Sequence, residues 1–427
     1  MADILINRLR NLKKDIRFVL IGLGAMGKGL LYQSLVTPGI KCVALAEINI
    51  VGAIEFLRSL NIEYRTVQNL KELHETIQHG ILAICEDGDI LARCGSADIL
   101  VESSSSISEA AKFSLRALQH QKHLVLMNAE IDLIFGPYLL EAAKKSGLVY
   151  TSCDGDQHSV IKRLADKIKL WGFDLVMAGN IKGFLDRYSD PAKIIPEADK
   201  RNLSYEMCAA MADGTKLNIE MAILSNALDL KTMKAGMNGP RAKHIHEVFS
   251  LFNFDKLWDG KPIADYVLGA EPDGGVFVIG HCNNPYQRNL LKYYKMGEGP
   301  FYLFYRPYHL CHVEAMECIA NAYLDKVSLL KPDFGFTTNV FAYAKRDLKK
   351  GEKLDGLGSY TCYGLIDNYK DLDQDSGLPI CISKDVTLKH DIKKDEKIFL
   401  ADVQYDPERF DFDLYFKGVE CSKRLRP

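Results

Sequence analysis

Short runs of apolar residues alternate with amphipathic stretches over the first third of the chain. The apolar or β-branched runs cover residues 18–21, 41–46, 81–84, 99–102, 123–127 and 148–150. Between them, residues 108–120 and 137–146 have the composition of helices. Continuous apolar runs are typical of parallel strands, because helices cover both faces of a parallel sheet. The pattern predicts a Rossmann-type α/β domain with a doubly wound parallel sheet over residues 1–153.

The alternation stops near residue 154. A helix is predicted from about residue 211 to 228, with an apolar stripe formed by Leu217, Met221, Leu224 and Leu228. We predict that this middle region, 154–333, forms an α+β domain that binds the substrate and joins subunits.

The last region has strand-like segments at 338–345 and 397–404. Two similar lysine-rich turns, 349–352 and 393–396, suggest a small β domain over residues 334–427 in which one turn is repeated. Such charge runs are usually solvated.

A glycine-rich turn follows the first apolar run. Gly22, Gly24 and Gly27 have the spacing of a dinucleotide-binding turn, and Ala25 and Met26 lie between them. Gly22 makes the turn, Gly24 lets a pyrophosphate approach the backbone, and Gly27 lets helix and strand pack closely. The helix N-terminus favours the anion.

An acidic residue ends the next predicted strand. Glu47 lies twenty residues after Gly27, where a carboxylate can accept hydrogen bonds from the ribose hydroxyls of an adenosine. The alternative is a glycine turn in another kind of α/β protein, with Glu47 as a solvated charge. We predict a dinucleotide site.

Polar residues follow two of the later strands. Ser103, Ser104, Asn128 and Glu130 are expected at the carboxyl ends of the strands, where open α/β sheets bind ligands. They are candidates to face the nicotinamide half of the cofactor. For the serines, an alternative is that they only cap the following helix.

A lysine and two carboxylates lie near the start of the predicted helix 211–228. Lys216, held by Asp213 or Glu220, could polarise a carbonyl and donate a proton to it. The alternative is a solvated surface pair of Lys216 and Glu220, and the helix alone favours this alternative. Lys182, between two turn glycines, is a further catalytic candidate.

Cations and histidines are dense between residues 293 and 312. Lys295, Arg306 and His309 are candidates to bind the anionic end of a substrate. His309 and His312 have no third ligand at a convincing spacing, so we expect no metal site there.

Composition narrows the class of protein. The chain has 427 residues, 47% of them hydrophobic, and a net charge of -2, so it lacks the basic field of a nucleic-acid or membrane-surface protein. The eleven cysteines follow no disulfide or zinc pattern and are expected as thiols. The N-terminus lacks a signal-peptide core, and no apolar run is long enough to cross a bilayer. We expect a cytoplasmic protein with no nucleic-acid or membrane partner.

Several motifs together resemble homoserine dehydrogenase-like oxidoreductases. They are the turn 22–27, the strand 98–102, and the segments 127–137 and 153–157. Three further segments, 213–216, 293–297 and 304–312, look like the branch that carries a C-terminal SAF domain. The resemblance covers nearly the whole chain and implies that the β domain is SAF-like.

This branch includes the deoxyxylulose-phosphate-reductoisomerase-like enzymes, which use NADPH to form methylerythritol phosphate. The resemblance implies an NAD(P)H-dependent, homo-oligomeric oxidoreductase that reduces the carbonyl of a small, anionic, phosphorylated polyhydroxy compound. Activity like that of 1-deoxy-D-xylulose 5-phosphate reductoisomerase, in isoprenoid biosynthesis, is the most concrete expectation.

Two alternatives remain open. One is the reduction of another sugar, a polyol or an amino-acid semialdehyde. True homoserine dehydrogenases carry a lysine where this chain has Glu130. The other is a sensor that binds a dinucleotide without turnover.

Overall fold

The computed structural model describes residues 4–201, 203–369, 372 and 377–426. The chain forms two compact units, each built from two separate segments. Unit 1 contains residues 1–156 and 310–331, and unit 2 contains residues 157–309 and 332–427. The division into three domains predicted from the sequence stays a prediction, although residues 310–331 belong to unit 1 and not to the middle region.

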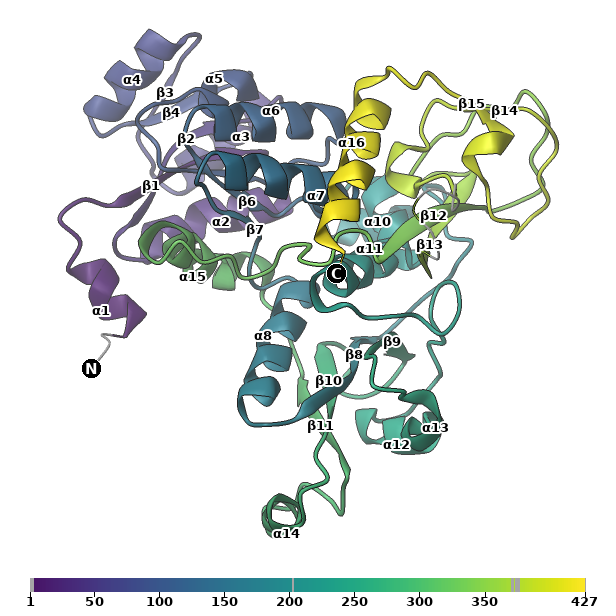
Figure 1. The fold of residues 1–427 in the computed structure, drawn as a ribbon. Helices are drawn as coiled ribbons and strands as arrows, with labels where there is room; N and C mark the ends of the chain where they lie inside the picture. The colour runs from purple at the N-terminus through teal and green to yellow at the C-terminus, as the bar shows by residue number, and fades with distance from the viewer. Residues whose placement is uncertain (1–3, 202, 370–371, 373–376, 427) are drawn as a thin grey trace. The chain divides into compact units, whose positions relative to one another are not determined.

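Unit 1 is organised around a seven-stranded parallel sheet (Figure 1). The strand order is β3-β4-β2-β1-β5-β6-β7. The strands are β1 (Ile16–Ile21), β2 (Ile40–Ala46), β3 (Tyr64–Thr66), β4 (Leu82–Cys85), β5 (Ile99–Glu102), β6 (His123–Leu126) and β7 (Tyr150–Ser152). The order reverses at β1, as in a doubly wound sheet, so the predicted fold class is confirmed.

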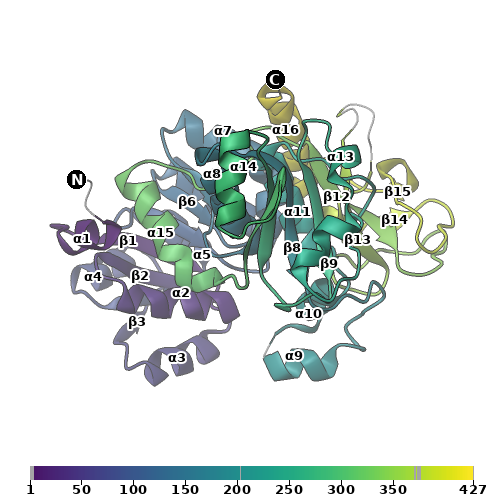
Figure 2. The same cartoon turned by 90° about the horizontal axis from the view of Figure 1, so that it is seen from below.

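Helices flank this sheet. They are α1 (Leu5–Arg10), α2 (Ala25–Val36), α3 (Ile50–Ser59), α4 (Leu70–Gln78), α5 (Gly88–Ala92), α6 (Ser108–Gln119), α7 (Ala129–Lys145) and α15 (Cys311–Leu324). Figures 1 and 2 both show α15 beside α2. The approach is close because α2 carries Gly29, where a Cβ atom would lie 2.3 Å from the ring of His312.

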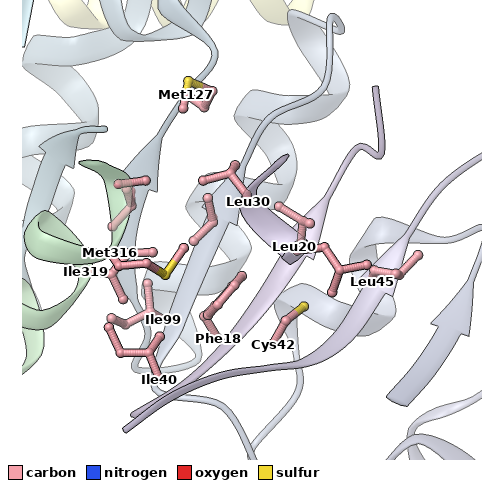
Figure 3. Packing of buried hydrophobic residues seen from close by; sticks show 14 of the residues in the cluster. Phe18, Leu20, Leu30, Ile40, Cys42, Leu45, Ile99, Met127, Met316 and Ile319 are labelled. Carbon is pink, nitrogen blue, oxygen red and sulfur yellow. The ribbon is translucent and has the colours of Figure 1, made fainter. Parts of the chain in front are cut away.

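The main core of unit 1 is a cluster of apolar side chains from β1, β2, β5 and α15. Figure 3 shows Phe18 and Leu20 of β1 among neighbours that include Met316 and Ile319 of α15. These four side chains are almost completely buried. The late segment 310–331 therefore completes the core that the first strands begin.

The described part of unit 2 contains a four-stranded mixed sheet and two two-stranded sheets, β12-β13 and β14-β15. The larger sheet has the order β11-β10-β8-β9 and consists of β8 (Asp174–Lys182), β9 (Ile263–Leu268), β10 (Val276–His281) and β11 (Phe301–Arg306). The remaining strands are β12 (Thr338–Ala344), β13 (Cys362–Asn368), β14 (Thr387–Leu388) and β15 (Val403–Gln404).

The helices of unit 2 vary in length and burial. The α-helices are α8 (Gln157–Leu170), α9 (Ile195–Arg201), α10 (Tyr205–Ala212), α11 (Thr215–Leu228), α12 (Val248–Leu251), α13 (Phe254–Leu257), α14 (Pro285–Tyr293) and α16 (Phe410–Leu425). Three short 3-10 helices are η1 (Ile245–Glu247), η2 (Ile380–Ile382) and η3 (Leu400–Asp402). Helix α11 lies against β12 and β13, as both views show.

Helix α11 differs from the amphipathic helix predicted from its sequence. Every residue of α11 except Lys216 is buried, so the helix has no solvated face. Its polar residues bond to the neighbouring strands: the N–H of Gly364 donates to Thr215 Oγ1, and the N–H of Ile366 donates to Asn218 Oδ1. The four residues of the predicted apolar stripe are buried, whereas the expected solvated face is wrong, because polar residues here satisfy the edge of a sheet.

Two local predictions in unit 1 also need correction. Helix α6 begins after Ile107 without any side-chain cap, so the serines before it do not cap it. The helix predicted from residue 137 begins earlier, at Ala129, because the side chain of Asn128 caps it by accepting the N–H of Ile131 at 3.3 Å.

The lysine-rich turns predicted in the last region make reciprocal contacts. Leu348 and Ile392, which directly precede the two turns, exchange backbone hydrogen bonds. Lys349 pairs with Asp391, and Lys393 pairs with Asp347. The predicted repeat is confirmed, whereas the predicted strand 397–404 is regular only at β15.

All eleven cysteines are thiols. In the part of the chain that the structure describes, no helix combines the length and hydropathy needed to cross a bilayer.

Candidate active site

The glycine turn of unit 1 has the backbone that its spacing predicts. Gly22 has φ +89°, in the region that favours glycine. A Cβ atom on Gly27 would lie 2.1 Å from the carbonyl oxygen of Gly22, so only glycine allows α2 to start this close to β1. These two glycines fix the turn against the sheet.

Gly24 differs from the other two glycines because the space beside it is open. It is the N-cap of α2, and a Cβ atom there would meet no atom within 4 Å. Ala25 and Met26 form the first turn of α2 and are exposed. Backbone N–H groups at such a helix start bind phosphate groups. The turn therefore fits the pyrophosphate of a dinucleotide.

The Glu47 carboxylate bonds to the glycine turn. Its Oε2 accepts the N–H of Leu23 at 2.6 Å, and its Oε1 accepts the N–H of Asn49 at 2.9 Å. The side chain is half-buried, and each oxygen retains a lone pair for a ligand hydroxyl. Glu47 thus lies where the sequence predicts a ribose contact.

Ser103, Ser104 and Asn128 form one network at the carboxyl ends of β5 and β6. The Ser103 hydroxyl donates to the carbonyl of Gly22 at 2.8 Å. Asn128 Nδ2 donates to the carbonyl of Ser104 at 2.8 Å. Ser103 therefore ties this edge of the sheet to the glycine turn, and Asn128 holds the loop that follows β5.

Two buried carboxylates lie at the same edge of the sheet. Glu130 is in the first turn of α7 and is 4% exposed. Glu102, the last residue of β5, is completely buried; its Oε1 accepts the N–H of Ser104, while its Oε2 has no hydrogen-bond partner. Burial raises the pKa of Glu102 to about 8. The sequence gives no signal that this glutamate is buried.

In unit 2, the catalytic candidates surround the start of α11. Lys182 ends β8, and its Nζ donates to the carbonyl of Met211 at 3.2 Å. Burial lowers the pKa of Lys182, and the nearby carboxylates of Glu220 and Asp213 oppose this shift. The structure therefore brings Lys182, Asp213 and Glu220 together.

Asp213 is paired with a lysine that the sequence analysis missed. Lys345 Nζ lies 2.8 Å from Asp213 Oδ2, and both side chains are buried. Lys345 also donates to the carbonyls of Ser189 and Ser359. Burial raises the pKa of Asp213, and the ammonium of Lys345 opposes the shift.

The solvated surface pair that the helix sequence favours is wrong. Glu220 is 6% exposed, and Lys216 is half-buried one turn earlier. The strands that cover α11 come from a distant part of the chain, so the helix sequence alone cannot reveal this burial.

The residues predicted to bind the anionic end of a substrate do not all lie at the same end of the four-stranded sheet. Arg306 is aligned with Val276 and Asn180 across three strands, which places it at the Lys182 end of the sheet. Its guanidinium lies over the ring of Tyr308. Lys295 precedes the opposite end of β11 and is exposed. His309 is half-buried three residues after Arg306.

Comparison with known proteins finds an oxidoreductase family over part of the chain. Residues 155–315 match the family model for the catalytic domain of oxidoreductase DRL. This segment includes Lys182, Asp213, Lys216 and Glu220. No curated protein matches the chain.

Solved structures with a similar fold include dehydrogenases. UDP-N-acetylglucosamine 3-dehydrogenase from Acidithiobacillus ferrooxidans is 10% identical, with a TM-score of 0.41 and coverage of 74% of this chain and 91% of that one. Scyllo-inositol dehydrogenase from Lactobacillus casei, solved with NAD(H) and scyllo-inositol, is 16% identical, with a TM-score of 0.35 and coverage of 62% and 74%. A DOX-P reductoisomerase is 14% identical, with a TM-score of 0.32 and coverage of 48% and 56%.

Proposed function

We propose that the protein is an NAD(P)H-dependent reductase of a small phosphorylated polyhydroxy carbonyl compound. The observation that carries the proposal is the group formed by Lys182, Asp213 and Glu220 in the segment that matches the oxidoreductase family. The open Gly24 at the start of α2 supports a dinucleotide as the reductant.

Reduction of a carbonyl needs a hydride and a proton. When bound, the nicotinamide supplies the hydride. We assign the proton to Lys182 Nζ, because its lowered pKa makes proton release easier and the neighbouring carboxylates orient the ammonium. A cation at the substrate oxygen also stabilises the negative charge that develops during hydride transfer. Lys216, the donor favoured from the sequence, is the alternative.

The proposed cofactor contacts come from the residues of unit 1 predicted above. The turn 22–27, with Ala25 and Met26, holds the pyrophosphate. Glu47 accepts hydrogen bonds from the hydroxyls of the adenosine ribose. The residues at the sheet edge hold the nicotinamide half: Ser103, Ser104, Asn128 and Glu130. Arg306 is the proposed contact for a substrate phosphate, with His309 beside it and Lys295 as the least supported candidate.

The most concrete substrate remains 1-deoxy-D-xylulose 5-phosphate, which the sequence resemblance to reductoisomerase-like enzymes with a SAF-like domain implies. The repeated turn in the last region is compatible with such a domain. Homo-oligomer formation belongs to the same proposal.

Substrate screening tests this function. Purified protein is mixed with NADH or NADPH and a panel of phosphorylated ketoses, aldehydes and unphosphorylated polyols, and loss of nicotinamide absorbance is followed. Turnover with a phosphorylated carbonyl compound and its loss in Lys182→Met are expected. Dinucleotide binding without turnover of any compound would favour a sensor instead.

A further inference from the structure

The segment 183–189 follows Lys182 directly and lies over the turn between α10 and α11. The N–H of Asp186 donates to the carbonyl of Ala212 at 2.8 Å. A Cβ atom on Gly214 would lie 2.8 Å from Leu185 Cδ1, so Leu185 packs on the residue after Asp213. The position of this segment is therefore tied to the positions of Lys182 and Asp213.

The β region at the end of the chain holds the same segment from another side. The Tyr188 hydroxyl lies 2.8 and 3.0 Å from the two carboxylate oxygens of Asp395. The Tyr363 hydroxyl donates to Asp395 at 2.8 Å. Lys394 Nζ lies 3.6 Å from the centre of the Tyr188 ring. Lys345 binds the carbonyl of Ser189.

Asp395 occupies in the second turn the position that Gly351 occupies in the first turn. The N–H of Gly351 in the first turn donates to Leu388, and the N–H of Asp395 in the second turn donates to Ala344 in the equivalent way. Both residues have positive φ, +82° and +67°. Glycine suits this conformation, whereas an aspartate there is disfavoured. The second turn thus keeps a carboxylate where the backbone favours glycine, and that carboxylate binds Tyr188.

We propose that Asp395 and Tyr188 form a latch that positions Lys182 for proton donation. The latch joins the second turn, 393–396, to the segment 183–189, and that segment fixes Lys182 relative to Asp213. Asp395 and Tyr188 are positioning residues, because they act on the reaction through Lys182. The inference rests on the proposed role of Lys182 in carbonyl reduction.

Two substitutions open the latch with little risk to folding. Asp395→Gly installs the residue that the equivalent position of the first turn already has. Tyr188→Phe removes only the hydroxyl. The control is Lys350→Ala in the first turn, at the position equivalent to Lys394, whose ammonium lies over the Tyr188 ring.

Hydrogen exchange measures the latch independently of turnover. The amide of Asp186 is expected to exchange at least about tenfold faster in Asp395→Gly and Tyr188→Phe than in the parent or in Lys350→Ala. Unchanged exchange in both latch variants would overturn the proposal, whatever the activity.

Steady-state kinetics then tests whether the latch positions Lys182. Both variants are expected to lower kcat about tenfold or more, because small displacements of a catalytic group are costly, with dinucleotide affinity unchanged. The double variant should lose no more kcat than Asp395→Gly alone, since that substitution already removes the bond to Tyr188 together with the bond to Tyr363. Asp395→Asn, which keeps an acceptor for Tyr188, should restore part of kcat. Faster exchange with unchanged kcat would overturn the positioning role. If no compound is turned over, the proposed function fails while the exchange result still decides the latch.

Discussion

Lys345 and Asp213 form a buried ion pair with 2.8 Å between Nζ and Oδ2. Lys345 directly follows β12, whereas Asp213 ends α10, so the pair joins distant parts of unit 2. Two backbone carbonyls complete the shell around the ammonium. Such an ion pair is stable when buried, because each charge faces an opposite charge and the ammonium protons have hydrogen-bond acceptors.

Removal of one partner is expected to be costly. Lys345→Met should lower the free energy of unfolding by about 3 to 5 kcal/mol, because it leaves a buried carboxylate without its counter-charge. Lys345→Met combined with Asp213→Asn should recover part of this loss. Urea unfolding of the three proteins is the measurement. A small loss in the single variant would mean that water reaches Asp213.

Gly24→Val should abolish dinucleotide binding while the protein stays folded. A Cβ atom at this position meets no protein atom, so any effect falls on the ligand that occupies the space. We expect affinity to fall about a hundredfold or more, equivalent to about 2.7 kcal/mol. Nicotinamide fluorescence titration measures it. Gly274→Val in unit 2, where a Cβ atom is equally unhindered, is the control.

The two candidate lysines can be separated by matched variants. Lys182→Met should lower kcat about a hundred- to a thousandfold, the usual effect of removing a preorganised donor. Lys216→Met should stay within about threefold of the parent if Lys182 is the donor. Steady-state kinetics with the compound found by screening decides between them. The reverse ranking would assign the proton to Lys216 and remove the mechanism proposed here for Lys182.

Glu102→Gln should make stability less dependent on pH. The pKa of Glu102 rises from 4.5 to about 8 on folding, so between these values the folded protein keeps a proton that the unfolded chain releases. The parent therefore loses stability as pH rises through this window, by at most about 1.4 kcal/mol per pH unit from this group, and the loss levels off above it.

The difference in unfolding free energy between Glu102→Gln and the parent should grow with pH across that window. Urea titrations at several pH values measure this difference. Glu109→Gln, at an exposed site in α6 paired with Lys112, is the control. A difference that is constant with pH would show that Glu102 is ionised throughout.

The glycine turn was predictable because its signal is local. Gly22 and Gly27 answer local demands of the backbone, a positive φ at Gly22 and the close approach of Gly27 to the carbonyl of Gly22, and the strands around them are continuous apolar runs. The signal of Glu47 is also local, because it directly follows β2 and bonds to the adjacent turn.

The environment of the charged cluster was not predictable in the same way. Glu220 is buried in a helix that contacts α8, β12 and β13, and all three elements are distant from α11 in the sequence. Lys345 has no local motif, and its role depends on Asp213 being beside it. Periodicity reports which residues prefer to be buried, whereas a buried charge depends on partners that only folding brings together.

The division of unit 1 into residues 1–156 and 310–331 has a consequence for synthesis on the ribosome. The seven strands of its sheet emerge first, but α15, which contributes Met316 and Ile319 to their core, emerges only after residues 157–309. The apolar face later covered by α15 is therefore open while that whole stretch is translated. A nascent chain at this stage exposes surface that chaperones recognise, so unit 1 completes its core late although it begins at the N-terminus.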